Sequence, residues 1–362
     1  SGLRTLGAAR MGNHFVLEVA VADQSDDIVY YASVPNEYAQ LFEKHTLSLF
    51  PHAILTIQPH DYNIFVDGGT TLVTEVALKK HPIYPIRSVE DFSGDPFATI
   101  LNAFSKIERE GGGAALQFAI RFPDKRYRET YESVIKEVEK GTKPAEAIER
   151  STVLGDFKNT VTGLIFQTNN KKKEDSPEPK IVDTRAAEIF RKKTSAEIVE
   201  VNIRMVVSAK EERRAAQVLG ELESTFHQFD QGEGNAFIFN RIRSGGLKRA
   251  TKAFAFREFS QKTALPLSLK ELSALIHFPE DGLDSTPQFR QSYAKTAPAP
   301  TEMPNEGTYL GINSHRGTER PIFVTEKDRM RHFYIIGQTG TGKSKFLTNL
   351  IAQDINSGAG VC

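Results

Sequence analysis

The sequence predicts an α/β protein. Patterns typical of strands and of capped, amphipathic helices follow one another as strand, helix, strand three times along the chain. Two polar, proline-containing segments interrupt this series. Near the end, an apolar stretch is followed by a glycine-rich loop and a helix pattern. These observations indicate several α/β units joined by linkers, and a length of 362 residues agrees with more than one domain.

The first region, residues 13–122, contains two of these blocks. In the first block, the sequence predicts strands at "HFVLEVAVA", "DIVYYASVP" and "HAILTIQ", with a helix at "NEYAQLFEKHTLSLFP" that is capped by Asn36. The second block has strands at "TTLVTEVALKKH" and "AALQFAIRF". Its helix, "DPFATILNAFSKIERE", is expected to begin at Asp95 and Pro96 and to end at glycines 111–113.

The third block occupies residues 196–280, with strands at "AEIVEVNIRMVVSA" and "NAFIFNRI" around a helix at "KEERRAAQVLGELESTFHQF". It ends in a short helix, "SLKELSALIHFP", where Ser268 and Glu271 have the spacing of a capping box. Residues 123–195 are predicted as a charged helix and a polar linker, and residues 281–306 as a proline-rich linker. Because split βαβ units produce such recurrences, we predict tandem ferredoxin-like α+β blocks, with helices on one face of a mainly antiparallel sheet.

Composition narrows the possible partners and location. Lys and Arg number 46 and Asp and Glu number 46, so contacts with nucleic acid or membrane surfaces would have to come from local patches. The single cysteine, Cys362, excludes an internal disulfide framework and is in keeping with a reducing compartment. The sequence has neither a signal-peptide pattern nor an apolar run of the roughly 18 residues that a membrane span needs. We therefore expect a cytoplasmic location, with any contact at the inner face of the cell membrane made by segments or partners outside this sequence.

The motif that carries chemistry lies in residues 307–362. Strand patterns at "RPIFVT" and "HFYII" lead into a loop that matches G-x-x-x-x-G-K-[ST] in full, and the helix pattern "KFLTNLIAQDINSGAG" follows it. In such a loop the glycines let backbone N–H groups surround phosphates, the lysine reaches the β- and γ-phosphates, and the final hydroxyl binds Mg²⁺. The sequence therefore predicts an ATP and Mg²⁺ site, with Ser344 as the metal ligand. The predicted nucleotide-binding residues are Gly337, Gln338, Thr339, Gly340, Thr341, Gly342, Lys343 and Ser344.

Residues 307–362 resemble the entry into the motor domain of HerA/FtsK-like P-loop ATPases, including the coupling proteins of conjugative type IV secretion. The resemblance rests on the loop, on Arg331 and His332 before it, and on the hairpin pattern from Gly311 to Gly317. It implies the first strand–loop–helix unit of a RecA-like domain, in a motor that forms a homo-oligomeric ring, commonly a hexamer, and moves DNA. The acidic Walker B strand and the arginine finger of such a motor would lie beyond Cys362. We therefore expect a truncated chain that binds ATP and does not turn it over.

Two hypotheses of function stay open. The parent protein is an ATP-driven DNA translocase or secretion coupling ATPase, or the region is a docking and assembly module that contacts proteins of a secretion complex. A P-loop kinase or GTPase is a third class, but the sequence shows no base-reading motif. The basic run "RIRSGGLKRATK", residues 241–252, is either a DNA-phosphate contact or a solvated hairpin tip. Phe254, Phe256 and Phe259 after it are expected to fill a core.

Overall fold

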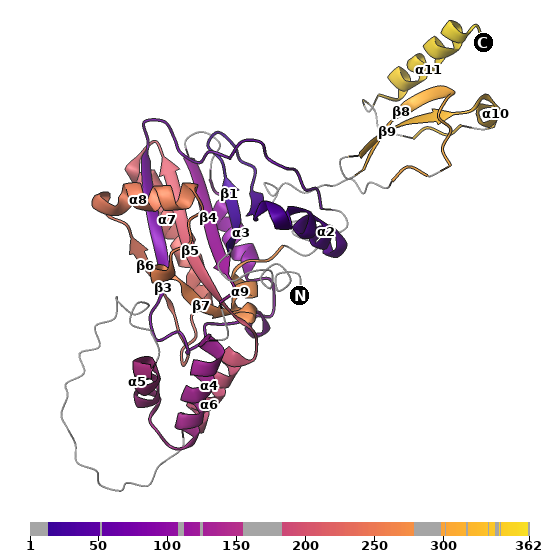
Figure 1. Ribbon diagram of the computed structural model, residues 1–362. Coiled ribbons are helices and arrows are strands. Elements are labelled where there is room, and N and C mark those ends of the chain that lie inside the picture. Colours follow the sequence, from indigo (N-terminus) through magenta and orange to yellow (C-terminus); the bar gives the residue numbers. More distant parts are fainter. Residues whose placement is uncertain are drawn as a thin grey trace, which may run out of the picture. The chain divides into compact units, whose positions relative to one another are not determined.

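A computed structural model gives the architecture of the chain (Figure 1). The chain forms two compact units, Ser1–His45 with Gln58–Arg290 and Thr46–Ile57 with Gln291–Cys362. The first unit has a mixed α/β fold around one large sheet, and the second contains a two-stranded sheet. The structure describes residues 14–50, 53–107, 112–123, 126–154, 183–278, 298–300, 302–315, 318–331, 333–336, 340 and 342–360.

One antiparallel sheet forms the centre of the first unit. Its strands lie in the order β2–β1–β4–β5–β3–β6, and β7 pairs with one end of β5. Every pair of neighbours is antiparallel, which confirms the predicted sheet type. β5 is buried throughout, because β4 pairs along one side of it, β3 and β7 share the other side, and helices α7 and α8 contact the strand as well. The strands are β1 (His14–Val21), β2 (Val29–Ser33), β3 (Thr70–Leu78), β4 (Gly112–Arg121), β5 (Ile198–Ala209), β6 (Phe237–Arg241) and β7 (Leu265–Ser268).

The connections between these strands interleave. Helix α3 (Phe97–Phe104) joins β3 to β4, which run parallel to each other with β5 between them. Helix α7 (Glu212–Thr225) joins β5 to β6, which run parallel with β3 between them. The prediction of tandem blocks is therefore wrong, because strands from all three blocks share one sheet. Without β5, one edge of β3 and one edge of β4 would have unpaired backbone N–H and C=O groups. β5 follows both strands in the chain and pairs with these two edges.

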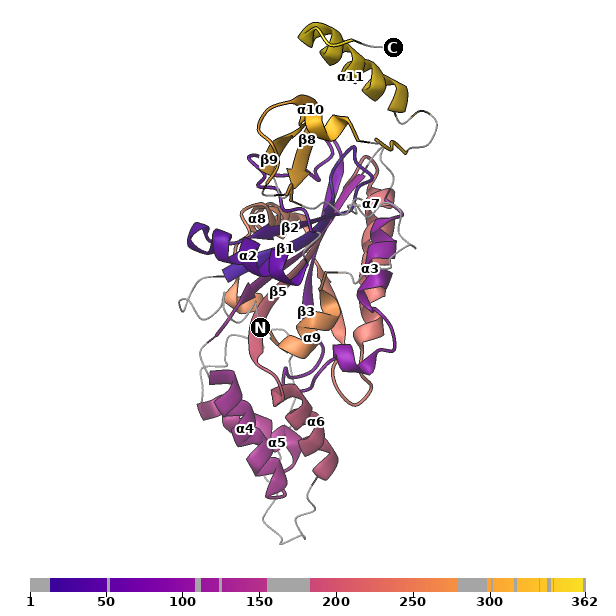
Figure 2. The same ribbon diagram turned by 90° about the vertical axis from the view of Figure 1, so that its right-hand side faces the viewer.

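Helices cover both faces of the sheet, whereas the sequence analysis placed them on one. Figure 2 shows α3 and α7 on one side of the sheet and α8 on the other. None of the helices that the structure describes has the length and hydrophobicity of a membrane span. The remaining helices in the described ranges are α2 (Ala39–Leu49), α4 (Arg126–Glu139), α5 (Pro144–Leu154), α6 (Thr184–Thr194), α8 (Ser244–Ala255), α9 (Leu269–Leu275), α10 (Glu326–Arg329) and α11 (Lys343–Ser357), with short 3₁₀ turns at Asn36–Tyr38, Val89–Asp91, Phe226–Phe229 and Gln261–Thr263.

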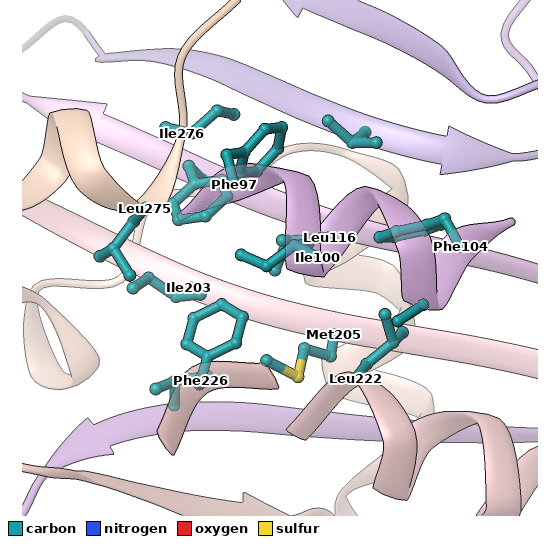
Figure 3. Close-up of a cluster of buried hydrophobic side chains, with 14 of the residues drawn as sticks. Phe97, Ile100, Phe104, Leu116, Ile203, Met205, Leu222, Phe226, Leu275 and Ile276 are labelled. Carbon is teal, nitrogen blue, oxygen red and sulfur yellow. The ribbon is translucent and has the colours of Figure 1, made fainter. Parts of the chain in front are cut away.

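The face of the sheet toward α3 and α7 is apolar. Alternate residues of β5, among them Ile203 and Met205, point toward Phe226 and Leu222 at the end of α7 (Figure 3). Phe97 of α3 lies in the same cluster, and these five side chains are at most 1% exposed. Full burial of a large apolar side chain contributes about 1.5–3 kcal/mol. This cluster therefore contributes substantially to the stability of the first unit.

The opposite face carries a buried polar network. Arg204 of β5 is 1% exposed and donates a hydrogen bond of 2.7 Å to the Gln117 side-chain oxygen. Gln117 donates to Glu18 at 2.7 Å, and the same carboxylate accepts from the Tyr62 hydroxyl at 2.9 Å and pairs with Arg257 at 3.0 Å. Burial raises the pKa of the Tyr62 phenol well above its usual value, so this group remains a donor at neutral pH. Because buried charges are costly unless they are paired, the network fixes these side chains relative to one another.

Helices α4, α5 and α6 lie between β4 and β5 in the chain and have a core of their own, which includes Tyr131 and Phe190. Lys193 of α6 connects this helical group to the sheet. Its ammonium lies 2.7 Å from the carboxylate of Glu271 in α9, and both side chains are at most 1% exposed. Glu271 also accepts the backbone N–H of Ser268 at 2.6 Å, which confirms the predicted capping box. One carboxylate therefore serves both the start of α9 and the attachment of α6.

Several local predictions also have outcomes in the first unit. Asp95 accepts the backbone N–H of Phe97 at 2.7 Å, but α3 begins at Phe97 with Pro96 at its N-cap, one residue later than predicted. The helix ends at Phe104, before the glycines that were expected to end it. Gly112 is instead the first residue of β4. Asn36 lies inside a 3₁₀ turn and does not cap α2. These differences arise at helix ends, where local patterns are weakest.

Two predicted segments adopt other structures, and one linker cannot be compared. Residues 53–58 of "HAILTIQ" form no strand, because no neighbouring strand pairs with them in the described chain. The predicted hairpin tip at residues 241–252 is wrong, since α8 begins at Ser244. Most of the linker predicted in residues 123–195 lies outside the described residues.

Replacement of Lys193 by Met should lower the free energy of unfolding by about 3–5 kcal/mol, because it leaves the Glu271 carboxylate buried without its cation. The double variant Lys193→Met with Glu271→Gln should lose less, since no charge remains buried. Arg150→Met is the control, because Arg150 pairs with Glu146 at an exposed site where such pairs contribute less than about 1 kcal/mol. Urea unfolding measures all three. Equal midpoints for Lys193→Met and Arg150→Met would contradict this role.

His81 should make stability depend on pH. Burial, and to a smaller extent the charge of Lys193, lowers the pKa of His81 from 6.5 to about 4. Its Nδ1 also accepts the backbone N–H of Ile83 at 3.3 Å, which favours the neutral ring. The unfolded chain therefore takes up a proton before the folded chain does, and the free energy of unfolding should fall by up to ~3 kcal/mol between pH 6.5 and pH 4.

The His81→Gln variant isolates this contribution. Its unfolding free energy should depend less steeply on pH over that window than the free energy of the wild-type chain. Urea unfolding at a series of pH values provides the comparison. Parallel pH profiles for the two proteins would show that His81 does not stay neutral in the fold.

Candidate nucleotide-binding site

The predicted phosphate loop lies in the second unit. Strands β8 (Thr308–His315) and β9 (Thr318–Val324) form an antiparallel pair, and α10 and α11 follow in the chain. The strand pattern at "RPIFVT" is confirmed as part of β9. The strand expected at "HFYII" is absent, since residues 333–336 have no regular secondary structure. A strand requires a hydrogen-bonding neighbour, and β8 and β9 pair only with each other among the described strands.

Helix α11 begins at the lysine of the motif. Gly342 occupies the N-cap position with φ of 90°, and Gly340 has φ of 86°. Both values lie in the left-handed region that residues with a side chain rarely adopt. No atom lies within 4 Å of the position that a Cβ would take at either glycine. The two glycines are therefore required by the course of the backbone, and the space beside them is open to a ligand.

The structure places part of the predicted site at this helix start. Lys343 is half-buried in the first turn of α11, and Ser344 is exposed beside it. Backbone N–H groups in the first turn of a helix have no intrahelical partner and attract anions. The other four predicted residues lie outside the described residues, namely Gly337, Gln338, Thr339 and Thr341.

The described residues therefore fit a phosphate group, because the first turn of α11 offers backbone N–H donors, the space at Gly340 and Gly342 is open, and Lys343 lies in the same turn. Mg²⁺ would be held by the phosphates and by Ser344, whose short hydroxyl suits a hard cation that keeps several of its waters. Elsewhere, the described chain has no group of three or more His, Cys, Asp or Glu residues placed to hold a metal ion.

Two side chains hold α11 to the strand pair within the second unit. Gln353 accepts the backbone N–H of Tyr309 at 2.8 Å and donates to the carbonyl of the same residue at 2.9 Å. Asp354 pairs with Arg329 of α10, and Arg329 also donates to the Thr308 hydroxyl at 3.1 Å. The hydrogen bond from Arg329 lowers the pKa of Asp354, so the carboxylate stays charged at neutral pH. These contacts fix the direction in which the start of α11 points.

Apolar side chains of the second unit remain exposed. Leu347, Ile351 and Ile355 of α11 recur at every fourth residue and are between 42% and 63% exposed. Tyr334 and Ile336, ahead of the loop, are 86% and 79% exposed. No residue of α11 is buried. The helix therefore presents an apolar stripe that no described part of its own unit covers.

Comparison with known proteins concerns mainly the first unit. Residues 5–291 match the family model of a domain of unknown function, DUF8128. The chain belongs to the DUF8128 family. The matched region contains the whole seven-stranded sheet and ends before β8, so the phosphate loop lies outside it. No curated protein matches the chain.

Sequence reasoning missed the polar network on the second face of the DUF8128 sheet. Its signal is visible in retrospect, since Glu18 interrupts the apolar pattern of β1, and Glu200, Asn202 and Arg204 occupy alternate positions of β5. Alternation places all three β5 side chains on one face. Polar residues at period two inside an otherwise apolar strand indicate a buried network when the strand lies at the centre of a sheet.

The Arg329→Met variant should loosen α11 without unfolding the first unit. The substitution removes the ion pair that joins Asp354 of α11 to α10, and also the hydrogen bond that joins α10 to Thr308 of β8, so Gln353 alone of the two anchoring side chains remains. Backbone amides of α11 should then exchange with deuterium several-fold faster, as hydrogen-exchange mass spectrometry measures. Lys327→Met on the same short helix is the control and should leave the exchange rates unchanged. Identical exchange in both variants would mean that α11 is held by other contacts.

Proposed function

We propose that this protein binds MgATP at the start of α11 and that it belongs to an ATP-driven motor. The motor is a DNA translocase or a coupling ATPase of conjugative type IV secretion, working as a homo-oligomeric ring. The observation that carries the proposal is the complete phosphate-loop motif, together with two left-handed glycines directly ahead of a 15-residue helix. Gly340 and Gly342 turn the backbone, Lys343 supplies the charge on the β- and γ-phosphates, and Ser344 is the protein ligand for Mg²⁺.

The exposed apolar residues of the second unit support the same proposal. In P-loop proteins the helix after the loop packs against a larger sheet. The stripe of Leu347, Ile351 and Ile355 is suited to such packing, and the apolar segment at residues 333–336 is suited to a strand of that sheet. We therefore propose that this unit is the first strand–loop–helix part of a RecA-like domain.

The DUF8128 region has its own proposed fold assignment. The interleaved crossovers through α3 and α7 give the strand order β6–β3–β5–β4, with all neighbours antiparallel. This order supports one ferredoxin-like core, to which β1, β2 and β7 are added. We propose that the core serves the motor as a substrate-handling or assembly region.

A docking module is the second candidate function, and one observation favours it. Ile54, Leu55 and Ile57 form a short apolar segment of which the two isoleucines are 75% and 93% exposed. Exposed clusters of this kind are typical of protein contact sites. Binding of DNA by the intact chain, weakening as salt rises, would favour the translocase. Its absence would favour docking within a secretion complex.

Lys343→Ala should weaken binding of MgATP by the intact chain. Hydrogen bonds to charged groups contribute about 1.5–3 kcal/mol. The dissociation constant should therefore rise about 10- to 100-fold in isothermal titration calorimetry. Lys345→Ala is the matched control, because Lys345 lies on the same helix turn outside the motif, and it should bind as the wild type does. Equal affinities for both variants, or no binding by the wild-type chain, would overturn the nucleotide site.

A further inference from the structure

Helix α8 lies in the most basic stretch of a chain that has no net charge. Residues 241–262 contain seven basic residues and one acidic residue, Glu258, against equal totals of 46 in the whole sequence. The structure turns part of this stretch into the helix Ser244–Ala255 on the polar side of the sheet. The basic residues are Arg241, Arg243, Lys248, Arg249, Lys252, Arg257 and Lys262.

Packing of α8 sorts these charges by face. Ala250 and Phe254 are buried against the sheet, together with the partly buried Leu247. Lys248 and Lys252, one helical turn apart, are exposed. The helix therefore places apolar side chains inward and cations outward.

Two of the basic residues are already used inside the fold. Arg241 donates hydrogen bonds to both carboxylate oxygens of Glu223, from Nε to Oε1 at 3.0 Å and from Nη2 to Oε2 at 2.7 Å. Arg257 pairs with Glu18 and with Asp61 at 3.0 and 2.8 Å. The other cations of α8 and its N-cap are exposed and have no carboxylate partner in the part of the chain that the structure describes, and these are Arg243, Lys248, Arg249 and Lys252. Uncompensated cations on one helix face attract polyanions.

An exposed aromatic ring completes this face. Phe256 follows the last turn of α8 and is 72% exposed, although the sequence analysis expected it in a core. The ammonium of Lys252 lies 5.7 Å from the centre of its ring. An exposed phenylalanine beside a row of cations is suited to stacking on a base that has no base-pairing partner, since bases inside a duplex are already stacked.

We propose that the outer face of α8 binds single-stranded nucleic acid, with Arg243, Lys248, Arg249 and Lys252 on the phosphates and Phe256 stacked on a base. The face is about 20 Å long from Arg243 to Phe256, at ~1.5 Å per helical residue, which is enough for a few nucleotides. Contacts with the phosphates and with the plane of a base do not distinguish one base from another, so we expect no preference for a nucleotide sequence. The proposal rests on the DNA-directed form of the proposed function, to which it adds the contact surface and the single-stranded form of the substrate.

The test measures binding of a fluorescently labelled single-stranded oligonucleotide of mixed sequence by the intact chain, without nucleotide, at several salt concentrations. In the α8 variant, Arg243, Lys248, Arg249 and Lys252 are all replaced by Gln. Each lost phosphate contact lowers the salt slope by about 0.7, so the slope of log affinity against log salt should fall by about 3, and affinity at low salt should fall at least tenfold. Arg241 is left unchanged because its loss would disturb the fold.

A control variant removes the same charge from other elements. It replaces four exposed basic residues by Gln, one just after β3, one on α4, one before α5 and one on α7, namely Lys79, Lys136, Lys143 and Arg213. This variant should keep the wild-type slope. Both variants change only exposed side chains, so their thermal unfolding should match that of the wild type.

Phe256 is tested separately. Phe256→Ala should weaken single-strand binding about tenfold, within the range of a lost stacking contact, while the salt slope stays unchanged. Phe256→Tyr should restore the affinity, and binding of a duplex should be the same in all three proteins. A loss of duplex binding equal to the loss of single-strand binding would overturn the stacking role.

The outcomes separate the two proposals. Equal binding by the α8 variant and the control variant would overturn the α8 surface and leave a DNA-directed function standing. Binding of phosphatidylserine vesicles that depends on these four cations, without binding of the oligonucleotide, would overturn it in favour of a membrane surface. Absence of single-strand binding in the wild type would overturn the α8 surface. Salt-dependent binding of a duplex by the same protein would leave DNA handling standing, and absence of both would overturn it too, whereas MgATP binding that depends on Lys343 would be unaffected.

Discussion

The buried guanidinium of Arg204 is the constraint on which the polar half of the first unit depends. A charge in the middle of a central strand must be hydrogen-bonded, and Arg204 reaches Gln117 and the backbone carbonyl of Glu258 at 2.7 and 2.6 Å. The second bond ties the chain just after α8 to the sheet. Arg257, which precedes Glu258 in the chain, has φ of 54°, a strained conformation for a residue with a side chain. Its ion pairs with Glu18 and Asp61 offset that strain. The buried charge of Arg204 thus holds the segment after α8, while Ala250 and Phe254 pack the helix itself against the sheet.

The two units carry different kinds of chemistry. The DUF8128 region has a closed core on one face of its sheet and a buried polar network on the other, and a group of exposed cations lies on α8. Among the described residues of the network, the Nε atoms of Arg204 and Arg257 are buried without a hydrogen-bond partner. The second unit has an open turn at Gly340 and Gly342 and apolar side chains in solvent.

Local features could be predicted from the sequence, and long-range pairing could not. The capping box of Ser268, the long strand β5 and the helix after the phosphate loop depend on residues close in the chain. "HAILTIQ" and "HFYII" have strand-like composition but form no strand, because a strand also needs a partner. Helix α8 was missed because Gly245 and Gly246 at its start are typical of a turn. The place of β3 between β5 and β6 depends on contacts between residues more than 120 positions apart, which no local pattern contains.

The central position of β5 has a consequence for synthesis on the ribosome. Its neighbours β3 and β4 emerge first, and until residues 198–209 follow, each exposes an unpaired edge of apolar strand. Such edges pair readily with other chains, so a nascent polypeptide that stalls between β4 and β5 is a hazard for aggregation. The helices α4, α5 and α6 are made during this interval and have a core of their own. These helices lengthen the interval before β5 is synthesised, but their separate core allows them to fold during it.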